Sequence, residues 1–144
     1  GEMPKPAGVV PDNLKQVNFL GNKIILLSNA VFGAPLILAF YLEIFPYAFL
    51  LIGVIFISLL YHTYGGRGLG KIDTLLAILL IAANVILIIL SKFKFQFSHL
   101  AIIIGALSLY VNYNEKIHYK TRHVIWHVLS SATCIFSLLA FAGV

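Results

Sequence analysis

Charged side chains are scarce in this chain. Lys and Arg number 10 and Asp and Glu number 5, so 15 of the 144 residues carry a charge, while 60% of the residues are hydrophobic. The mean hydropathy of +0.98 lies far outside the range of soluble domains. The charges fall between long apolar runs, as the cost of a charge at the bilayer centre predicts. The composition therefore predicts one integral membrane domain, and which membrane holds it is left open.

Cysteine is almost absent as well. Cys134 is the only one, which excludes an intramolecular disulfide, and its place in an apolar run predicts a small packing residue. The net charge of +5 is spread between apolar runs, which favours membrane topology over nucleic-acid binding. Residues 1–21 form an N-terminal tail that lacks the pattern of a cleaved signal peptide, and the opening Gly1-Glu2 is compatible with an expression remnant.

The sequence instead contains long apolar runs. Five of them approach the roughly 20 residues that a helix needs to cross a hydrocarbon core. Residues 22–144 are therefore predicted to form an all-α, polytopic membrane bundle of about five transmembrane helices. We place these helices at about 22–41, 44–62, 72–91, 96–114 and 120–142.

Basic residues predict the orientation of this bundle, because cytoplasmic loops carry the excess of Lys and Arg. With the N-terminus inside, only Lys92 and Lys94 would lie outside. The residues that would lie inside are Lys5, Lys15, Lys23, Arg67, Lys71, Lys116, Lys120 and Arg122. The bias predicts an N-in, C-out topology.

Glycine and proline mark the irregular points. Residues 65–71 contain four glycines, each of which costs roughly 1 kcal/mol in a helix, so this segment is predicted to be a loop. Pro35 is expected to kink the first helix and to leave a carbonyl that Ser28, Asn29 or a water satisfies. Asn29 and Asn84 are mid-helix amides, and for both we expect hydrogen bonds between helices.

Three histidines are predicted to meet at the inner membrane face. His62 ends the second helix, and His123 and His127 lie one turn apart at the start of the fifth. Two intervening crossings return the chain to the same side. Three neutral imidazoles plus one water form a standard catalytic arrangement for tetrahedral zinc, so the pattern predicts a Zn²⁺ site. His99 opens the fourth helix on the outer side and His118 lies in a loop, so neither is assigned to the metal.

Two further polar residues are expected at this face. Asp73 begins the third helix, and Ser58 lies one turn before His62. We interpret Asp73 as the group that orients a metal-bound water or a ligand imidazole, with Ser58 as a hydrogen-bonding partner. A metal-bound water with its pKa lowered toward ~7 is a nucleophile at neutral pH. Asp73 and Ser58 are therefore the candidate catalytic residues.

Each residue also has an interpretation that needs no site. His62 alone suits an interfacial histidine, and Asp73 suits a helix N-cap. Ser58 could bond its own backbone. His123 and His127 could form a basic face that touches lipid headgroups. Their predicted location at one membrane face favours a site.

At these residues the sequence resembles the CREST superfamily of membrane hydrolases, which includes alkaline ceramidases, the adiponectin and progestin receptor family and myomaker-like proteins. The resemblance rests on Ser58-Leu59-Leu60-Tyr61-His62, on Asp73 and on His123-Val124-Ile125-Trp126-His127. The Trp before the last His is similar to that of ceramidase-like and myomaker-like members. The resemblance implies zinc on the three histidines, Asp73 holding the zinc-bound water and Ser58 lining the site. It also implies hydrolysis of a lipid amide such as a ceramide, on a bundle that usually has seven helices.

The leading hypothesis is thus a zinc-dependent intramembrane hydrolase whose partner is a lipid substrate or bilayer lipid. The alternative is a non-enzymatic, membrane-remodelling or structural protein with a structural zinc. A b-type haem site would need His62 opposite His123 or His127. A channel is disfavoured because the polar residues cluster at one end of the bundle. A second subunit could complete the small bundle, so a homo-oligomer is also a hypothesis.

Overall fold

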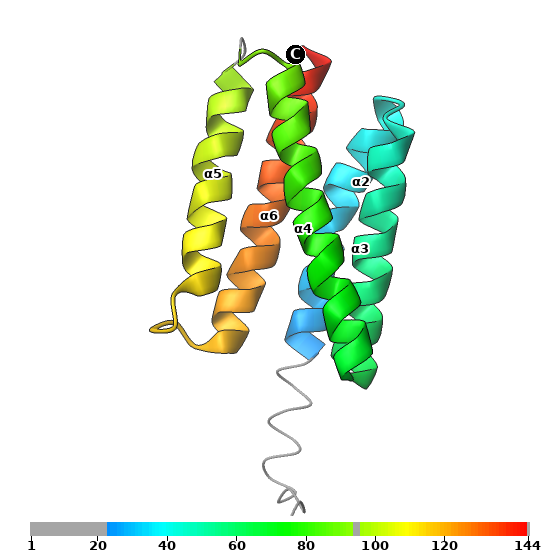
Figure 1. Cartoon of the computed structure of the whole chain (residues 1–144), viewed down its shortest axis with the longest axis vertical. Coiled ribbons are helices and arrows are strands. Elements are labelled where there is room, and N and C mark those ends of the chain that lie inside the picture. Colours follow the sequence, from blue (N-terminus) through cyan, green and yellow to red (C-terminus); the bar gives the residue numbers. More distant parts are fainter. Residues whose placement is uncertain (1–22, 94–95, 144) are drawn as a thin grey trace, which may run out of the picture.

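The computed structural model describes residues 23–93 and 96–143, and within them the chain is an all-α bundle with no strand. The first helical segment, Lys23–Tyr41, contains the short 3₁₀ helix η1 (Asn29–Phe32) and α2 (Gly33–Tyr41). Four further helices follow (Figure 1). They are α3 (Phe45–Tyr64), α4 (Arg67–Leu90), α5 (Gln96–Tyr113) and α6 (Tyr119–Ala142). The prediction of an all-α bundle of five helical segments is confirmed.

Four of these segments are long and apolar enough to cross a membrane. They are Lys23–Tyr41, α3, α4 and α6, with mean hydropathies between 1.8 and 2.7. The remaining helix, α5, has 18 residues and carries polar side chains near both ends, such as Gln96, His99 and Asn112. That α5 also crosses a membrane stays a prediction.

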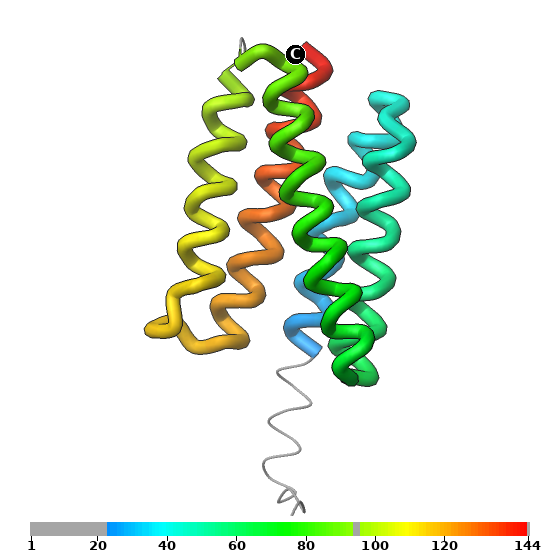
Figure 2. The backbone as a smooth tube through the Cα atoms, in the orientation of Figure 1, coloured from blue at the N-terminus to red at the C-terminus, as the bar shows by residue number. Residues whose placement is uncertain are grey.

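The helices run up and down, and α6 lies at the centre of the bundle (Figure 2). α5 packs along one side of α6, while α4 and α2 pack against α6 from other directions. α3 packs on α2 and α4. The core is built from apolar side chains of α2, α3, α4 and α6, which include Ala39, Leu51, Leu80 and Leu138.

Basic residues gather at one end of the bundle, as predicted. The start of the first segment, the α3–α4 turn and the α5–α6 turn all lie at the same end in Figure 1. Among the described residues this end carries Lys23, Arg67, Lys71, Lys116, Lys120 and Arg122, and the other end carries Lys92. Lys5, Lys15 and Lys94 lie outside the described residues. The end with the most basic residues is called the basic end below, and its placement inside the membrane stays a prediction.

The predicted loop at 65–71 is wrong over most of its length. Only Gly65 and Gly66 form a turn, with φ angles of 73° and 102° that favour glycine, and α4 begins at Arg67 rather than at residue 72. Gly70 is tolerated inside the helix because it faces Tyr61. A Cβ on Gly70 would lie 3.1 Å from Cε2 of the Tyr61 ring. The missing side chain therefore lets the first turns of α4 approach the end of α3.

The irregular first segment is stabilised differently from what we predicted. The helix narrows to a 3₁₀ turn at 29–32 just before Pro35. The carbonyl of Val31, four residues before the proline, accepts a hydrogen bond of 2.8 Å from Oγ of Ser131 on α6. Neither Ser28 nor Asn29 fills this role, because both side chains donate to the carbonyl of Ile25. The expected interhelical bond of Asn29 is therefore not formed.

Asn84 behaves as predicted and joins three helices in the core. Oη of Tyr47 on α3 donates to Oδ1 of Asn84 on α4 at 2.5 Å, and Nδ2 of Asn84 donates to Sγ of Cys134 on α6 at 3.6 Å. All three side chains are buried. Cys134 is thus the small packing residue expected from the sequence, and it is also a weak hydrogen-bond acceptor.

Candidate metal centre

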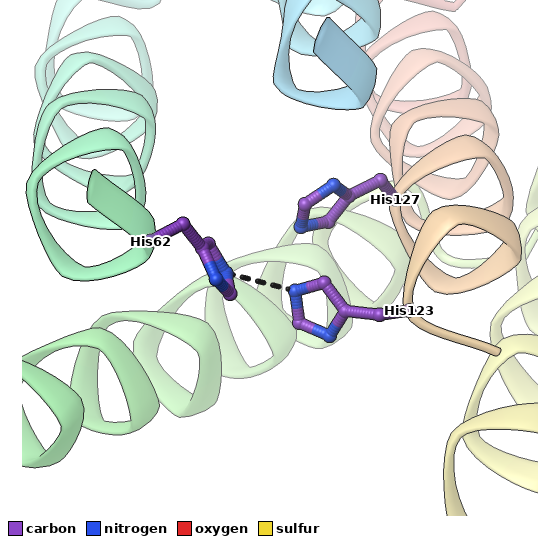
Figure 3. Close-up of side chains that lie close together, drawn as sticks. All are labelled: His62, His123 and His127. Carbon is purple, nitrogen blue, oxygen red and sulfur yellow. Dashed lines mark hydrogen bonds between the residues drawn. The ribbon is translucent and has the colours of Figure 1, made fainter. Parts of the chain in front are cut away.

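The three predicted histidines converge at the basic end of the bundle (Figure 3). His62 lies in the last turn of α3, and His123 and His127 lie one turn apart near the start of α6. The ring centroids of His62 and His123 are 4.8 Å apart, and those of His123 and His127 are 4.5 Å apart. Nε2 of His123 lies 3.0 Å from Nε2 of His62. One ligand nitrogen from each ring falls within 4.8 Å of the others.

This spacing suits a metal ion. Zinc–nitrogen bonds of ~2.0–2.1 Å in a tetrahedral site place the ligand nitrogens ~3.3 Å apart. The observed nitrogens need only small side-chain movements to reach that arrangement. The three histidines can therefore hold a metal ion. Among the described residues this cluster has no fourth histidine, cysteine or carboxylate ligand, so three protein ligands would leave one coordination position open.

A serine fixes the third histidine. Oγ of Ser28 lies 2.6 Å from Nδ1 of His127 and 2.6 Å from the carbonyl oxygen of Ile25. The single hydroxyl proton is donated to that carbonyl, so Nδ1 of His127 carries the proton and donates to Ser28. The lone pair of His127 is then on Nε2, as a metal ligand requires. The edge contact of His127 with Phe32, at 5.6 Å between ring centroids, holds the same ring from another side.

Ser28 was not predicted as a site residue. The available signal was its position: it is the sixth residue of the first helical segment, which begins at the end where the histidines meet. Sequence periodicity alone does not give the rotation of that helix about its axis, and this rotation brings Ser28 to His127.

Asp73 and Ser58 both lie beside the cluster. They line one cavity of about 280 Å³ together with His123, His127 and Trp126. Asp73 is the seventh residue of α4, whose N-cap is Gly66, so the interpretation of Asp73 as a helix cap is wrong. Ser58 is buried and makes no hydrogen bond among the described residues, so it does not bond its own backbone.

The cluster separates this cavity from an open hollow at the basic end. The hollow is lined by His62 and by basic and aromatic side chains, among them Tyr61, Tyr119, Arg67 and Lys71. His123 and Asp73 line both spaces, while His127 lines only the cavity. A group bound at the histidines would thus lie between an apolar interior and a polar mouth.

An aromatic contact supports the outer histidine. The ring of Tyr119 lies 5.4 Å from that of His123, and the guanidinium of Arg122 lies 5.6 Å from the Tyr119 ring. His127 is only 4% exposed. The interpretation of His123 and His127 as a face that touches headgroups is therefore wrong for His127, whose ring is turned into the bundle.

The remaining histidines stand apart from the cluster, as expected. His99 is exposed on α5 near the opposite end. His118 is the N-cap of α6, where its Nδ1 accepts a hydrogen bond of 3.4 Å from the backbone N–H of Lys120. A haem bound between His62 and His123 does not fit this arrangement, because ring nitrogens in direct contact leave no space for a macrocycle between them.

Comparison of the chain with protein-family models, with curated proteins and with solved structures finds no match.

Proposed function

We propose that this protein is a zinc-dependent hydrolase that cleaves a lipid amide of the ceramide type at a membrane surface. The observation that carries the proposal is a cluster of three histidines with an open fourth position, placed where an apolar cavity meets a polar mouth. Catalytic zinc sites keep such a position for water or substrate, whereas structural sites fill all four positions with protein ligands. The resemblance of the motif residues to CREST hydrolases supports the same reaction.

Zinc is the proposed metal because three imidazole ligands in a tetrahedral arrangement are typical of it. When bound, it would polarise the amide carbonyl and provide a water that is nucleophilic at neutral pH. His62, His123 and His127 would hold the ion. Ser28 would keep the His127 ring in the tautomer that binds metal.

Asp73 is the proposed proton carrier. Asp73 lines both the cavity and the open hollow, as His123 does. A general base has to lie within hydrogen-bond reach of the water that it deprotonates, and the carboxyl could then pass that proton to the leaving amine. Ser58, which has no partner among the described residues, would offer a hydrogen bond to the substrate from the cavity wall.

A structural zinc is the second candidate, and one observation favours it. Over their described residues α3 and α6 do not pack closely on each other; both pack on α2 and α4. A metal on His62, His123 and His127 would tie α3 to α6 directly. Such a metal would stabilise the bundle without any reaction.

Metal analysis of the purified protein tests the first step. We expect about one zinc per chain, strongly reduced in His127→Ala and unchanged in the matched control His99→Ala, whose histidine lies outside the cluster. Full zinc occupancy in His127→Ala would refute the assignment.

A hydrolysis assay on ceramides and N-acyl amines tests the second step and separates the two candidates. General acid–base catalysis contributes roughly 10²–10⁴-fold, so Asp73→Asn should keep its zinc and lose about that factor in rate. If the zinc-loaded wild type cleaves none of these amides, the structural role is favoured.

A further inference from the structure

The glycine-rich segment 65–71 has no part in the proposed reaction. It forms the α3–α4 turn and the start of α4, and it borders the open hollow beside the candidate metal centre. Gly65, Gly66, Arg67, Gly70 and Lys71 all line this hollow. Arg67 and Lys71 are the only Lys or Arg side chains among the described residues of its lining.

Arg67 and Lys71 lie in an electrostatically unfavourable place. Arg67 is the first residue of α4 and Lys71 follows one turn later, so both cations lie at the positive end of a helix of 24 residues. They also form a like-charge pair spaced by four residues, which destabilises a helix. The first turn of α4 has no acidic residue, and its N-cap makes no side-chain hydrogen bond. An anion held here would reverse each of these effects.

The described part of the protein does not supply this anion. Over residues 23–93 and 96–143, neither Arg67 nor Lys71 has a hydrogen-bond or ion-pair partner, and both side chains are exposed. Asp73 is the one carboxylate in the lining of the hollow, so the two cations leave an excess of one positive charge there. Over the whole basic end, six Lys and Arg side chains face two acidic ones, Asp73 and Glu115, among the described residues. The hollow is thus a positively charged recess whose cations are free to bind.

Neutral polar groups of the hollow are free as well. The hydroxyls of Tyr61, Tyr64 and Tyr119 and the amide of Asn112 make no hydrogen bond among the described residues. The hollow has a volume of about 1140 Å³, which is comparable with the largest ligand sites, of ~1,000 Å³. It can therefore hold a group much larger than a single inorganic ion.

The open hollow lies at the level where lipid headgroups are expected. α3 ends and α4 begins beside it, and both helices are long and apolar enough to cross a membrane. Tyr64 and Tyr119 in its lining are 78% and 48% exposed, and tyrosine is enriched at the headgroup level of membranes. Anionic lipids attract Lys and Arg that lie next to a membrane span. The nearest source of anions for this hollow is therefore the bilayer.

We propose that the open hollow binds the headgroup of an anionic membrane lipid, with the lipid phosphate between Arg67 and Lys71. The guanidinium offers a planar fork of donors to phosphate oxygens, and the ammonium adds a point charge. The tyrosine hydroxyls and Asn112 are the partners for the rest of the headgroup. The site needs neither zinc nor a reaction, so it goes beyond the proposed function. Because His62 and His123 line the same hollow, the bound headgroup would cover the polar side of the histidine cluster.

Native mass spectrometry of the detergent-solubilised full chain tests this site. The probes are phosphatidylglycerol and phosphatidylcholine with identical acyl chains, and the former should bind more tightly because only it carries a net negative charge. Arg67→Gln and Lys71→Gln should each weaken phosphatidylglycerol binding about fivefold, and the double variant about 25-fold. The matched control is Lys116→Gln, which removes an exposed charge at the same end but outside the hollow. It should bind like the wild type.

Several outcomes would overturn the proposal. Equal affinities for the two lipids would exclude a preference for anionic headgroups, and an unchanged affinity in the double variant would exclude Arg67 and Lys71. A loss in Lys116→Gln as large as in the single variants would show a diffuse attraction to the basic end instead of a site. If inorganic phosphate displaces phosphatidylglycerol at an equal concentration, the hollow binds soluble phosphate and not a lipid.

Lipid binding and metal binding can fail independently. His127→Ala and the chelator-treated wild type should lack zinc and keep the preference for phosphatidylglycerol. If the preference disappears with the zinc, the phosphate binds the metal and the role of Arg67 and Lys71 is wrong. If the wild type holds no zinc but shows the preference and both losses, the lipid site stands and the hydrolase does not. If zinc and hydrolysis are present while the double variant binds lipid like the wild type, only the lipid site is refuted.

Discussion

Removal of the Ser28 hydroxyl is the most informative single change, because it alters the metal centre without touching a ligand. Ser28 accepts a hydrogen bond from Nδ1–H of His127 and donates one to the carbonyl of Ile25. In Ser28→Ala the buried Nδ1–H loses its partner, and the tautomer with the lone pair on Nε2 is no longer favoured. Loss of such a supporting hydrogen bond typically costs 10–100-fold in metal affinity, or about 1.4–2.7 kcal/mol.

The assay is a competition titration of detergent-solubilised protein against a zinc chelator of known affinity. Ser137→Ala is the matched control, since Ser137 is also buried but its hydroxyl has no hydrogen-bond partner among the described residues. It should bind zinc like the wild type. Ser28→Thr keeps a hydroxyl and should retain most of the affinity. Equal affinities of Ser28→Ala and the wild type would show that Ser28 does not position His127, and an equal loss in Ser137→Ala would point to a general packing defect.

Three other perturbations probe the centre and its supports. Gly70→Ala should press on the Tyr61 ring next to His62 and weaken zinc binding in the same titration, whereas Gly68→Ala, with open space at its Cβ, should instead stabilise α4 by up to ~1 kcal/mol. Tyr47→Phe leaves Oδ1 of Asn84 without its donor and should lower the free energy of unfolding by about 0.6–1.7 kcal/mol. Unfolding in mixed micelles measures this change, and an unchanged free energy would contradict the role of this hydrogen bond. Zinc at 100 times its dissociation constant should raise the free energy of unfolding by about 2.7 kcal/mol. Removal of the zinc by a chelator should therefore lower the unfolding temperature. An unchanged unfolding temperature would argue against a bound metal in the folded protein.

The fold could be predicted because hydropathy depends only on the order of the residues along the chain. The apolar runs located all five helical segments to within a few residues, except at the start of α4. There the cost of glycine in a helix suggested a loop, whereas α4 already begins at Arg67 and the missing side chain of Gly70 leaves room for the Tyr61 ring. A contact between two helices cannot be read from the propensity of one residue.

The metal ligands could be predicted by counting crossings. An even number of helices between His62 and the pair His123 and His127 returns the chain to the same face, and a spacing of four puts the pair on one side of α6. The residues that hold the histidines and helices in place could not be predicted by counting crossings. The contact of Ser28 with His127, like that of Ser131 with Val31, depends on how each helix is rotated about its axis, and that rotation is set by packing over the whole bundle.

The position of the centre also bears on how a small bundle could carry this chemistry. α3 supplies His62 and α6 supplies the other two ligands, yet these helices pack on α2 and α4 rather than closely on each other. Among the described residues the ring of His62 contacts those of His123 and His127 at this end. A bound zinc would therefore both complete the bundle and create the reactive centre. Stabilisation by zinc is thus no argument against catalysis, and access of water or substrate to a fourth coordination position would distinguish the two roles.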